Sequence, residues 1–164
     1  MYHLKKDIGG MVTQYLDALQ ENEGYLQHVQ GRLQSRLYHD NEGKNSESFR
    51  VLLLKRVQQY PDKPVFTELL LWHFIQQRDL SSALVQAKAL DKRYREDGSR
   101  LMNLADLCVS NEDYDAALQA YGYVIEKGMH SSLYIRARME VLNTLSKKLT
   151  SGAGAPVAEL EALE

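Results

Sequence analysis

The side chains able to hold a metal or catalyse a reaction are few in this chain and lie far apart. Histidine can ligate zinc or act as a general base, and the five histidines are His3, His28, His39, His73 and His130. None of them is paired with another histidine or with a glutamate at the spacing that metal ligands need. The sequence therefore predicts no metal site.

The other reactive side chains fit structural roles better than catalytic ones. Cys108 is the only cysteine and lies on an apolar stripe, so we expect a buried thiol rather than a nucleophile. Asp113 and Asp115 are typical of a helix start rather than of an acid–base pair. The run 152–154 has the glycines of a phosphate loop but follows a helix and lacks the Lys-Ser/Thr ending, which indicates a flexible loop. We expect no enzymatic activity and no cofactor.

Charge and hydropathy exclude two classes of partner. The 164 residues carry 20 Lys and Arg and 22 Asp and Glu, for a net charge of −2. Because the two signs are balanced along the chain, no basic field exists for nucleic acid or for an anionic membrane. The richest apolar segment, 65–75, is too short and too polar to cross a membrane. We expect a protein that is cytoplasmic, or exported if a parent chain carried a signal peptide.

The elements that must position these residues are predicted to be helices. Apolar residues recur at spacings of three and four, as in Leu101, Leu104, Ala105 and Cys108, and strand-like alternation is absent. About nine helices of 12–18 residues result, so the fold class is all-α. The predicted breaks are 23–24, 40–46, 60–64, 78–79, 97–98, 111–113, 128–131 and 150–156.

Specific residues are expected to start and stop these helices. The carboxylates of Asp79 and Asp113 can accept hydrogen bonds from the free amides of the next turn. Gly98 and Gly128 can adopt the left-handed conformation that ends a helix. The first helix is expected over 7–20.

A repeat period links several of these helices. Residues 79–84 and 113–118 align without a gap, with Ala83 matching Ala117. This interval is about 34 residues, within the range of periods found in helical repeat proteins. One step of the same length back from Ala83 reaches Phe49, and a further, slightly longer step reaches Met11. The extra residues fall in the polar loop 41–45, where insertions are tolerated.

This pattern resembles the tetratricopeptide repeat, a 34-residue helix–turn–helix unit that reads W-x2-L-G-x2-Y, then A-x3-F, then P. The best unit has Leu101, Leu104, Ala105 and Cys108 at the first set of positions, and Ala117 and Tyr121 at the second. The resemblance implies a right-handed superhelix, cut from a longer array of bacterial type. It implies a single array over 1–164, with units at 1–23 (partial), 24–63, 64–97, 98–131 and 132–164 (partial). A closed helical bundle is the alternative.

The resemblance also implies where a partner would bind, because the first helices of such units line a concave groove. The expected function is a non-catalytic scaffold that holds a peptide segment or a partner domain there. The alternative is a regulatory part of a longer chain with a catalytic domain elsewhere. The candidate groove residues are Gln34, Tyr38, Glu68, Trp72, Ile75, Gln76, Met102, Asn103, Asp106, Arg136, Glu140 and Asn143.

Two features qualify this groove. Trp72 can be an interface anchor, since tryptophan is enriched at binding hot spots, or a core residue packed between repeats. The members of the family that grip a terminal carboxylate use Lys and Asn, and here Asn103 alone fits that pattern. Glu68 and Asp106 have the wrong sign, so acidic chaperone tails are not the expected ligand.

Self-association is a further expectation. In an array cut at both ends, the terminal helices lack the neighbours that would cover their apolar faces. The residues expected to be uncovered are Met11, Tyr15 and Leu19 near the start, and Leu142, Leu145 and Leu160 near the end. We expect weak association through them.

Overall fold

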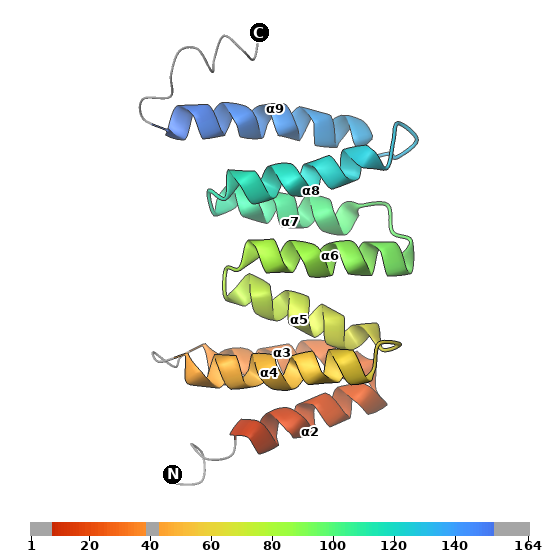
Figure 1. Cartoon of the computed structure of the whole chain (residues 1–164), viewed down its shortest axis with the longest axis vertical. Coiled ribbons are helices and arrows are strands. Elements are labelled where there is room, and N and C mark those ends of the chain that lie inside the picture. The colour runs from red at the N-terminus through yellow and green to blue at the C-terminus, as the bar shows by residue number, and fades with distance from the viewer. Residues whose placement is uncertain (1–7, 39–42, 153–164) are drawn as a thin grey trace. The chain divides into compact units, whose positions relative to one another are not determined.

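The computed structural model describes residues 8–38 and 43–152, and in these residues it contains eight α-helices, one short 3₁₀ helix and no strand (Figure 1). The helices are 12 to 18 residues long, which confirms the predicted all-α class and helix length. The helix expected after residue 156 lies outside the described residues. The elements are α2 (Ile8–Glu21), η1 (Glu23–Tyr25), α3 (Leu26–Leu37), α4 (Lys44–Gln59), α5 (Pro64–Gln76), α6 (Leu80–Tyr94), α7 (Ser99–Ser110), α8 (Tyr114–Glu126) and α9 (Tyr134–Ser151).

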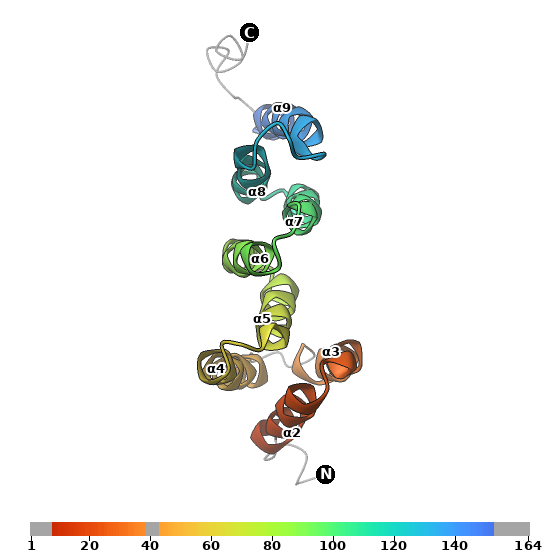
Figure 2. The same cartoon turned by 90° about the vertical axis from the view of Figure 1, so that its right-hand side faces the viewer.

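The chain divides into two compact units, Met1–Gln86 and Ala87–Glu164, and the division falls within α6. In the first unit, α2 packs against α4 and α5, while α5 also packs against α3 (Figure 2). Apolar side chains at helical spacing turn one face of α2, α3 and α4 inward. The fully buried ones include Val12, Leu16, Leu19, Val29, Leu33, Phe49, Leu53, Phe66, Leu69 and Leu70.

The second unit is built on α7, α8 and α9, with α8 packed against both of the others. Small residues on α8, Ala117 and Ala120, are 0% exposed, and they let neighbouring helices approach closely. Tyr121 and Val124 of the same helix are buried beside them. Cys108 of α7 is also buried, which confirms the core position predicted for its thiol.

The turn that ends α5 has a defined backbone geometry. Arg78 is in the left-handed conformation with φ 57°, and the next amide, of Asp79, donates to the Phe74 carbonyl oxygen at 2.9 Å. A left-handed residue followed by a bond to the carbonyl five residues back is a Schellman helix stop. The Asp79 carboxylate then accepts from the Ser82 amide at 3.1 Å and starts α6, as predicted.

The turn that ends α7 repeats this geometry one period later. Glu112 has φ 61°, and the Asp113 amide donates to the Cys108 carbonyl oxygen at 2.9 Å. The Asp113 carboxylate accepts from the Ala116 amide at 3.2 Å and starts α8. The alignment of residues 79–84 with 113–118 therefore corresponds to one turn geometry that occurs twice.

Other helix ends follow the sequence in part. Gly128, with φ 94°, follows α8, so this predicted left-handed stop is confirmed. Gly98 is also left-handed, with φ 95°, but it directly precedes α7 and does not end α6, so the stop predicted there is wrong. Arg95 ends α6 with φ 51°, and the Glu96 amide donates to the Asp91 carbonyl oxygen at 2.9 Å, which makes a third stop of the same kind.

Two expectations about the first unit are wrong. Leu19 was expected to lack a neighbour, but it is 0% exposed because α4 and α5 pack on the inner face of α2. The predicted break between helices at 40–46 extends too far toward the C-terminus. Helix α4 begins at Lys44, directly after Gly43 takes the left-handed conformation with φ 67°.

At the other end, Leu142 of α9 is 66% exposed, as expected for a helix without an outer neighbour. The repeat boundaries, the superhelix and self-association stay predictions, and residue 160 lies outside the described ranges. Within those ranges, no helix combines the length and the apolar character that a membrane crossing requires.

Candidate functional site

The candidate site of the first unit lies where α3, α4 and α5 meet, and His73 is at its centre. Helix α5 is apolar on nearly all sides, with Leu69, Leu70, Leu71 and Phe74 buried around the histidine. A helix of that kind is covered by neighbours on several faces. His73 is consequently only 1% exposed.

The imidazole of His73 is held by one hydrogen bond and by aromatic rings. Its Nδ1 lies 2.8 Å from the Tyr38 hydroxyl oxygen at the end of α3. The ring centroids of Phe49 and Phe74 lie 5.1 and 5.9 Å away. Burial, helped by the positive charge of Arg50, lowers the pKa of His73 to about 4. The imidazole is therefore neutral at neutral pH.

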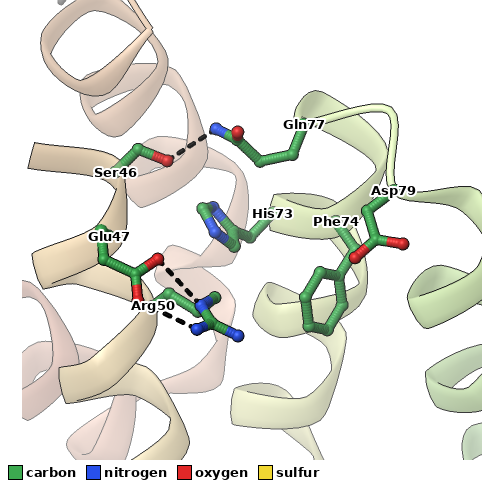
Figure 3. Close-up of a pocket in the computed structure, with 7 residues that line it drawn as sticks. All are labelled: Ser46, Glu47, Arg50, His73, Phe74, Gln77 and Asp79. Carbon is green, nitrogen blue, oxygen red and sulfur yellow. Dashed lines mark hydrogen bonds and ion pairs between the residues drawn. The ribbon is translucent and has the colours of Figure 1, made fainter. Parts of the chain in front are cut away.

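A pocket of about 260 Å³ opens beside this histidine (Figure 3). Gln77 donates from Nε2 to the Ser46 hydroxyl at 2.6 Å across its upper end. Arg50 donates two hydrogen bonds to the Glu47 carboxylate, at 2.9 and 3.1 Å. The lining is mostly polar and already paired. The lining residues are Ser46, Glu47, Arg50, His73, Phe74, Gln77 and Asp79.

Next to the pocket, the structure brings together two of the candidate groove residues, Tyr38 and Trp72. Their ring centroids are 5.7 Å apart at an interplanar angle of 72°, an edge-to-face pair. Both side chains are half-buried. Burial raises the pKa of the Tyr38 hydroxyl, so it remains protonated. Glu68, Ile75 and Gln76 are also half-buried on α5, and Gln34 of α3 is exposed.

In the second unit, three other candidate residues gather around one tyrosine. Asp106 of α7 accepts from the Tyr121 hydroxyl at 2.6 Å and pairs with Arg136 of α9 at 3.1 Å. Burial and this bond to Asp106 raise the pKa of Tyr121, and the charge of Glu140 adds to the shift. The hydrogen bond therefore links α8 to α7, and the half-exposed ion pair links α7 to α9.

The remaining groove residues differ in exposure. Met102 is 1% exposed and belongs to the core of the second unit, so a ligand cannot reach it. Its side chain follows the same buried face of α7 as Leu101 and Ala105. Asn103 and Asn143 are exposed.

Sequence reasoning missed the buried carboxylate of Asp91, which is 0% exposed on α6. It accepts from the Gly98 amide at 3.0 Å, from the Tyr123 hydroxyl at 2.8 Å and from the Lys127 ammonium at 2.6 Å. The signal was in the sequence, since Asp91 follows the buried Ala87 by four residues and therefore lies on the same helix face. All three partners hold the turn after α6 against α8.

The surroundings of the residues expected to be unreactive can now be described, beginning with Cys108. Burial, with the negative charge of Asp113, raises the pKa of Cys108 to about 11, so the thiol stays protonated at neutral pH. Among the described residues, His, Cys, Asp and Glu do not form a group of three or more suited to a metal ion. Of the glycine run, 153 and 154 lie outside the described residues.

Comparisons with models of known protein families, with curated proteins and with solved structures found no match.

Proposed function

We propose that this chain is a non-catalytic binding module of tetratricopeptide type, with repeats stacked in a right-handed superhelix. The turn geometry that recurs one period apart supports the repeat, because residues 74–83 and 108–117 have matching backbone hydrogen bonds. In this proposal the ligand is a peptide segment or a partner domain, and it binds the first unit over the exposed edges of Tyr38 and Trp72.

The half-buried Trp72 is the observation that carries this proposal. It is the only tryptophan of the chain, and it remains partly exposed although its neighbours Leu71 and His73 are buried. The edge-to-face contact with Tyr38 restrains the indole, and Tyr38 is itself fixed by its bond to His73. An aromatic side chain ordered before binding loses little conformational entropy when a partner covers it.

The test selects peptides from a random library on the full chain and measures the affinity of a synthetic winner. We expect Trp72→Ala to weaken that affinity about 30-fold, corresponding to about 2 kcal/mol for a hot-spot residue. Trp72→Phe should retain part of it. The matched control is Tyr25→Ala, since Tyr25 is another exposed aromatic of the same unit, at 51% exposure, and should leave the affinity unchanged.

Two results would contradict this assignment. One is a peptide that binds the Trp72→Ala chain as tightly as the original. The other is a Trp72→Ala chain whose melting temperature falls by several degrees while its affinity is kept, because that combination identifies Trp72 as a packing residue alone.

A further inference from the structure

Helix α9 presents an apolar stripe that the described part of the chain does not cover. Ile135, Met139 and Leu142 are 65%, 60% and 66% exposed. Their spacing of four and three residues places them on one face of the helix. The opposite face, with Ala137 and Thr144, is buried against α8. Contiguous exposed apolar side chains are a common feature of interaction surfaces.

The charge of α9 limits what that surface can bind. The helix carries Arg136, Arg138, Lys147 and Lys148 against the single acid Glu140, for a net charge of +3. Asp106 and Asp115 pair with two of these cations and reduce the local charge to +1. A second copy of α9 would bring like charges together across the contact. An apolar segment with acidic side chains would instead be attracted to it.

The chain itself contains such a segment close to α9. After Gly152 it continues for twelve more residues, which carry three glutamates and no Lys or Arg, for a charge of −3. Within them Val157, Leu160 and Leu163 recur every three residues. This spacing is typical of one apolar face flanked by acids.

The length of the intervening chain allows this segment to reach the stripe. An extended chain from Gly152 to Val157 can span up to about 18 Å, and eight further residues add about 12 Å even at a helical rise. Leu142 lies ten residues before Gly152, which is about 15 Å along a helix, and Met139 lies about 20 Å away. Because the segment is tethered to α9, its effective concentration there is in the millimolar range.

We propose that residues 157–164 bind to the face of α9 formed by Ile135, Met139 and Leu142. This proposal does not depend on the peptide surface proposed around Trp72, and the experiments for the two are independent.

The experiment measures the oxidation of individual methionines by hydrogen peroxide in the full chain, with mass spectrometry as the detection.

Two methionines calibrate this measurement within one molecule, and Met139 is the probe. Met129 is 79% exposed and should oxidise fast, whereas Met102 is 1% exposed and should oxidise slowly. Met139, at 60%, would match Met129 if its face were uncovered. If residues 157–164 bind there, we expect Met139 to oxidise at least about threefold more slowly than Met129.

The variant Leu160→Glu should abolish this protection and leave Met102 slow, which also shows that the fold is intact. The control variant Ala158→Ser should keep it. A chain ending at Gly152 should behave like Leu160→Glu, and a synthetic peptide of residues 153–164 at millimolar concentration should restore protection.

Two outcomes would overturn the proposal. In the first, Met139 oxidises as fast as Met129 in the full chain. In the second, protection appears only as the protein concentration is raised from about 5 to 500 μM, which would identify a second copy of the chain as the occupant.

Discussion

His73 in the first unit and Asp91 in the second are both buried titratable side chains, and each is hydrogen-bonded to a tyrosine hydroxyl. The Tyr38 hydroxyl oxygen lies 2.8 Å from His73 Nδ1, and the Tyr123 hydroxyl oxygen lies 2.8 Å from Asp91 Oδ2. The surroundings then differ. His73 is neutral, contacts aromatic rings and borders a pocket, whereas Asp91 also accepts from a backbone amide and an ammonium group.

This difference separates a structural cluster from a candidate site. Three donors surround the Asp91 carboxylate and tie a backbone turn to a neighbouring helix, so little capacity remains for a ligand. The neutral His73 ring makes a single hydrogen bond, with the Tyr38 hydroxyl, and the Tyr38 ring makes an edge-to-face contact with the half-buried Trp72. Both groups are buried, so the number of partners and the pocket distinguish them. A polar group whose hydrogen-bonding capacity is fully used favours stability, while one that borders a pocket leaves room for binding.

The largest expected effect is that of Asp91→Ala. The substitution leaves the Gly98 amide without its acceptor and Lys127 without its buried partner, so we expect the free energy of unfolding to fall by about 3 to 4 kcal/mol. Urea denaturation followed by circular dichroism measures it.

The matched control is Asp115→Ala in the same unit. Asp115 also pairs with a lysine, Lys148 at 2.8 Å, but its side chain is 75% exposed. Exposed pairs contribute little, so the loss should be below about 0.5 kcal/mol. Equal effects at Asp91 and Asp115 would mean that burial does not distinguish the two carboxylates.

The second effect concerns pH and the first unit. The pKa of His73 is about 4 in the folded protein and 6.5 in the unfolded chain, so the unfolded chain takes up the proton first as the pH falls. The stability from neutral His73 is complete above pH 6.5 and is lost progressively toward pH 4. The total is about 3 kcal/mol, at about 1.4 kcal/mol for each unit of pKa difference.

Denaturation of the original chain and of His73→Gln across pH 7.5 to 4 measures this loss. The charged groups facing His73, Glu47 and Arg50 of α4, are the same in both chains. The variant should be less stable at pH 7 and should show a flatter pH dependence. Parallel curves for the two chains would show that His73 is not the titrating group.

The third effect tests the turn that Asp91 holds. Gly98 has φ 95°, and an added Cβ would lie 3.2 Å from Val124 Cγ2 and 3.3 Å from Lys127 Cε. Gly98→Ala should therefore cost about 2 kcal/mol, from backbone strain and this crowding. Gly122→Ala is the control, because Gly122 lies inside α8 with nothing within 4 Å of such a Cβ. It should stabilise the protein by about 0.5 kcal/mol, and a stabilising Gly98→Ala would contradict the observed turn.

The smallest expected changes in stability come from substitutions at the two repeated turns, after α5 and after α7. Arg78→Gly and Glu112→Gly each remove a side chain from a left-handed residue. The relief of strain exceeds the entropy that glycine loses on folding, so each change should raise stability by about 0.5 kcal/mol. Similar increments in the melting temperature would support equivalent turns, and opposite signs would show that they are not energetically equivalent.

Much of the local structure was predictable because it depends on neighbours in sequence. The carboxylates of Asp79 and Asp113 accept from amides three residues ahead, and Gly98 and Gly128 take the left-handed conformation. Those outcomes follow from side-chain reach and from backbone sterics within one turn. Leu19 was misjudged because its cover comes from helices that begin much later in the chain.

The site was less predictable, because its residues meet through tertiary packing. The repeat register selected Tyr38 and Trp72, which do meet, but also Met102, which is buried. The spacing of the histidines excludes His73 only as a metal ligand. Its place between Trp72 and Phe74 on an apolar helix is a separate signal, and that signal indicates burial. Its bond to Tyr38 joins residues 35 positions apart, and no local pattern predicts such a contact.

The three Schellman stops place side chains of both charges, Arg78, Arg95 and Glu112, at exposed left-handed positions. Hydrogen bonds between main-chain groups set the backbone path there, so the fold does not depend on which side chain is present. A substitution that reverses the charge at one of these positions should change the free energy of unfolding by less than about 0.5 kcal/mol. The helix ends are thus sites where selection can retune surface electrostatics while the buried scaffold stays constant.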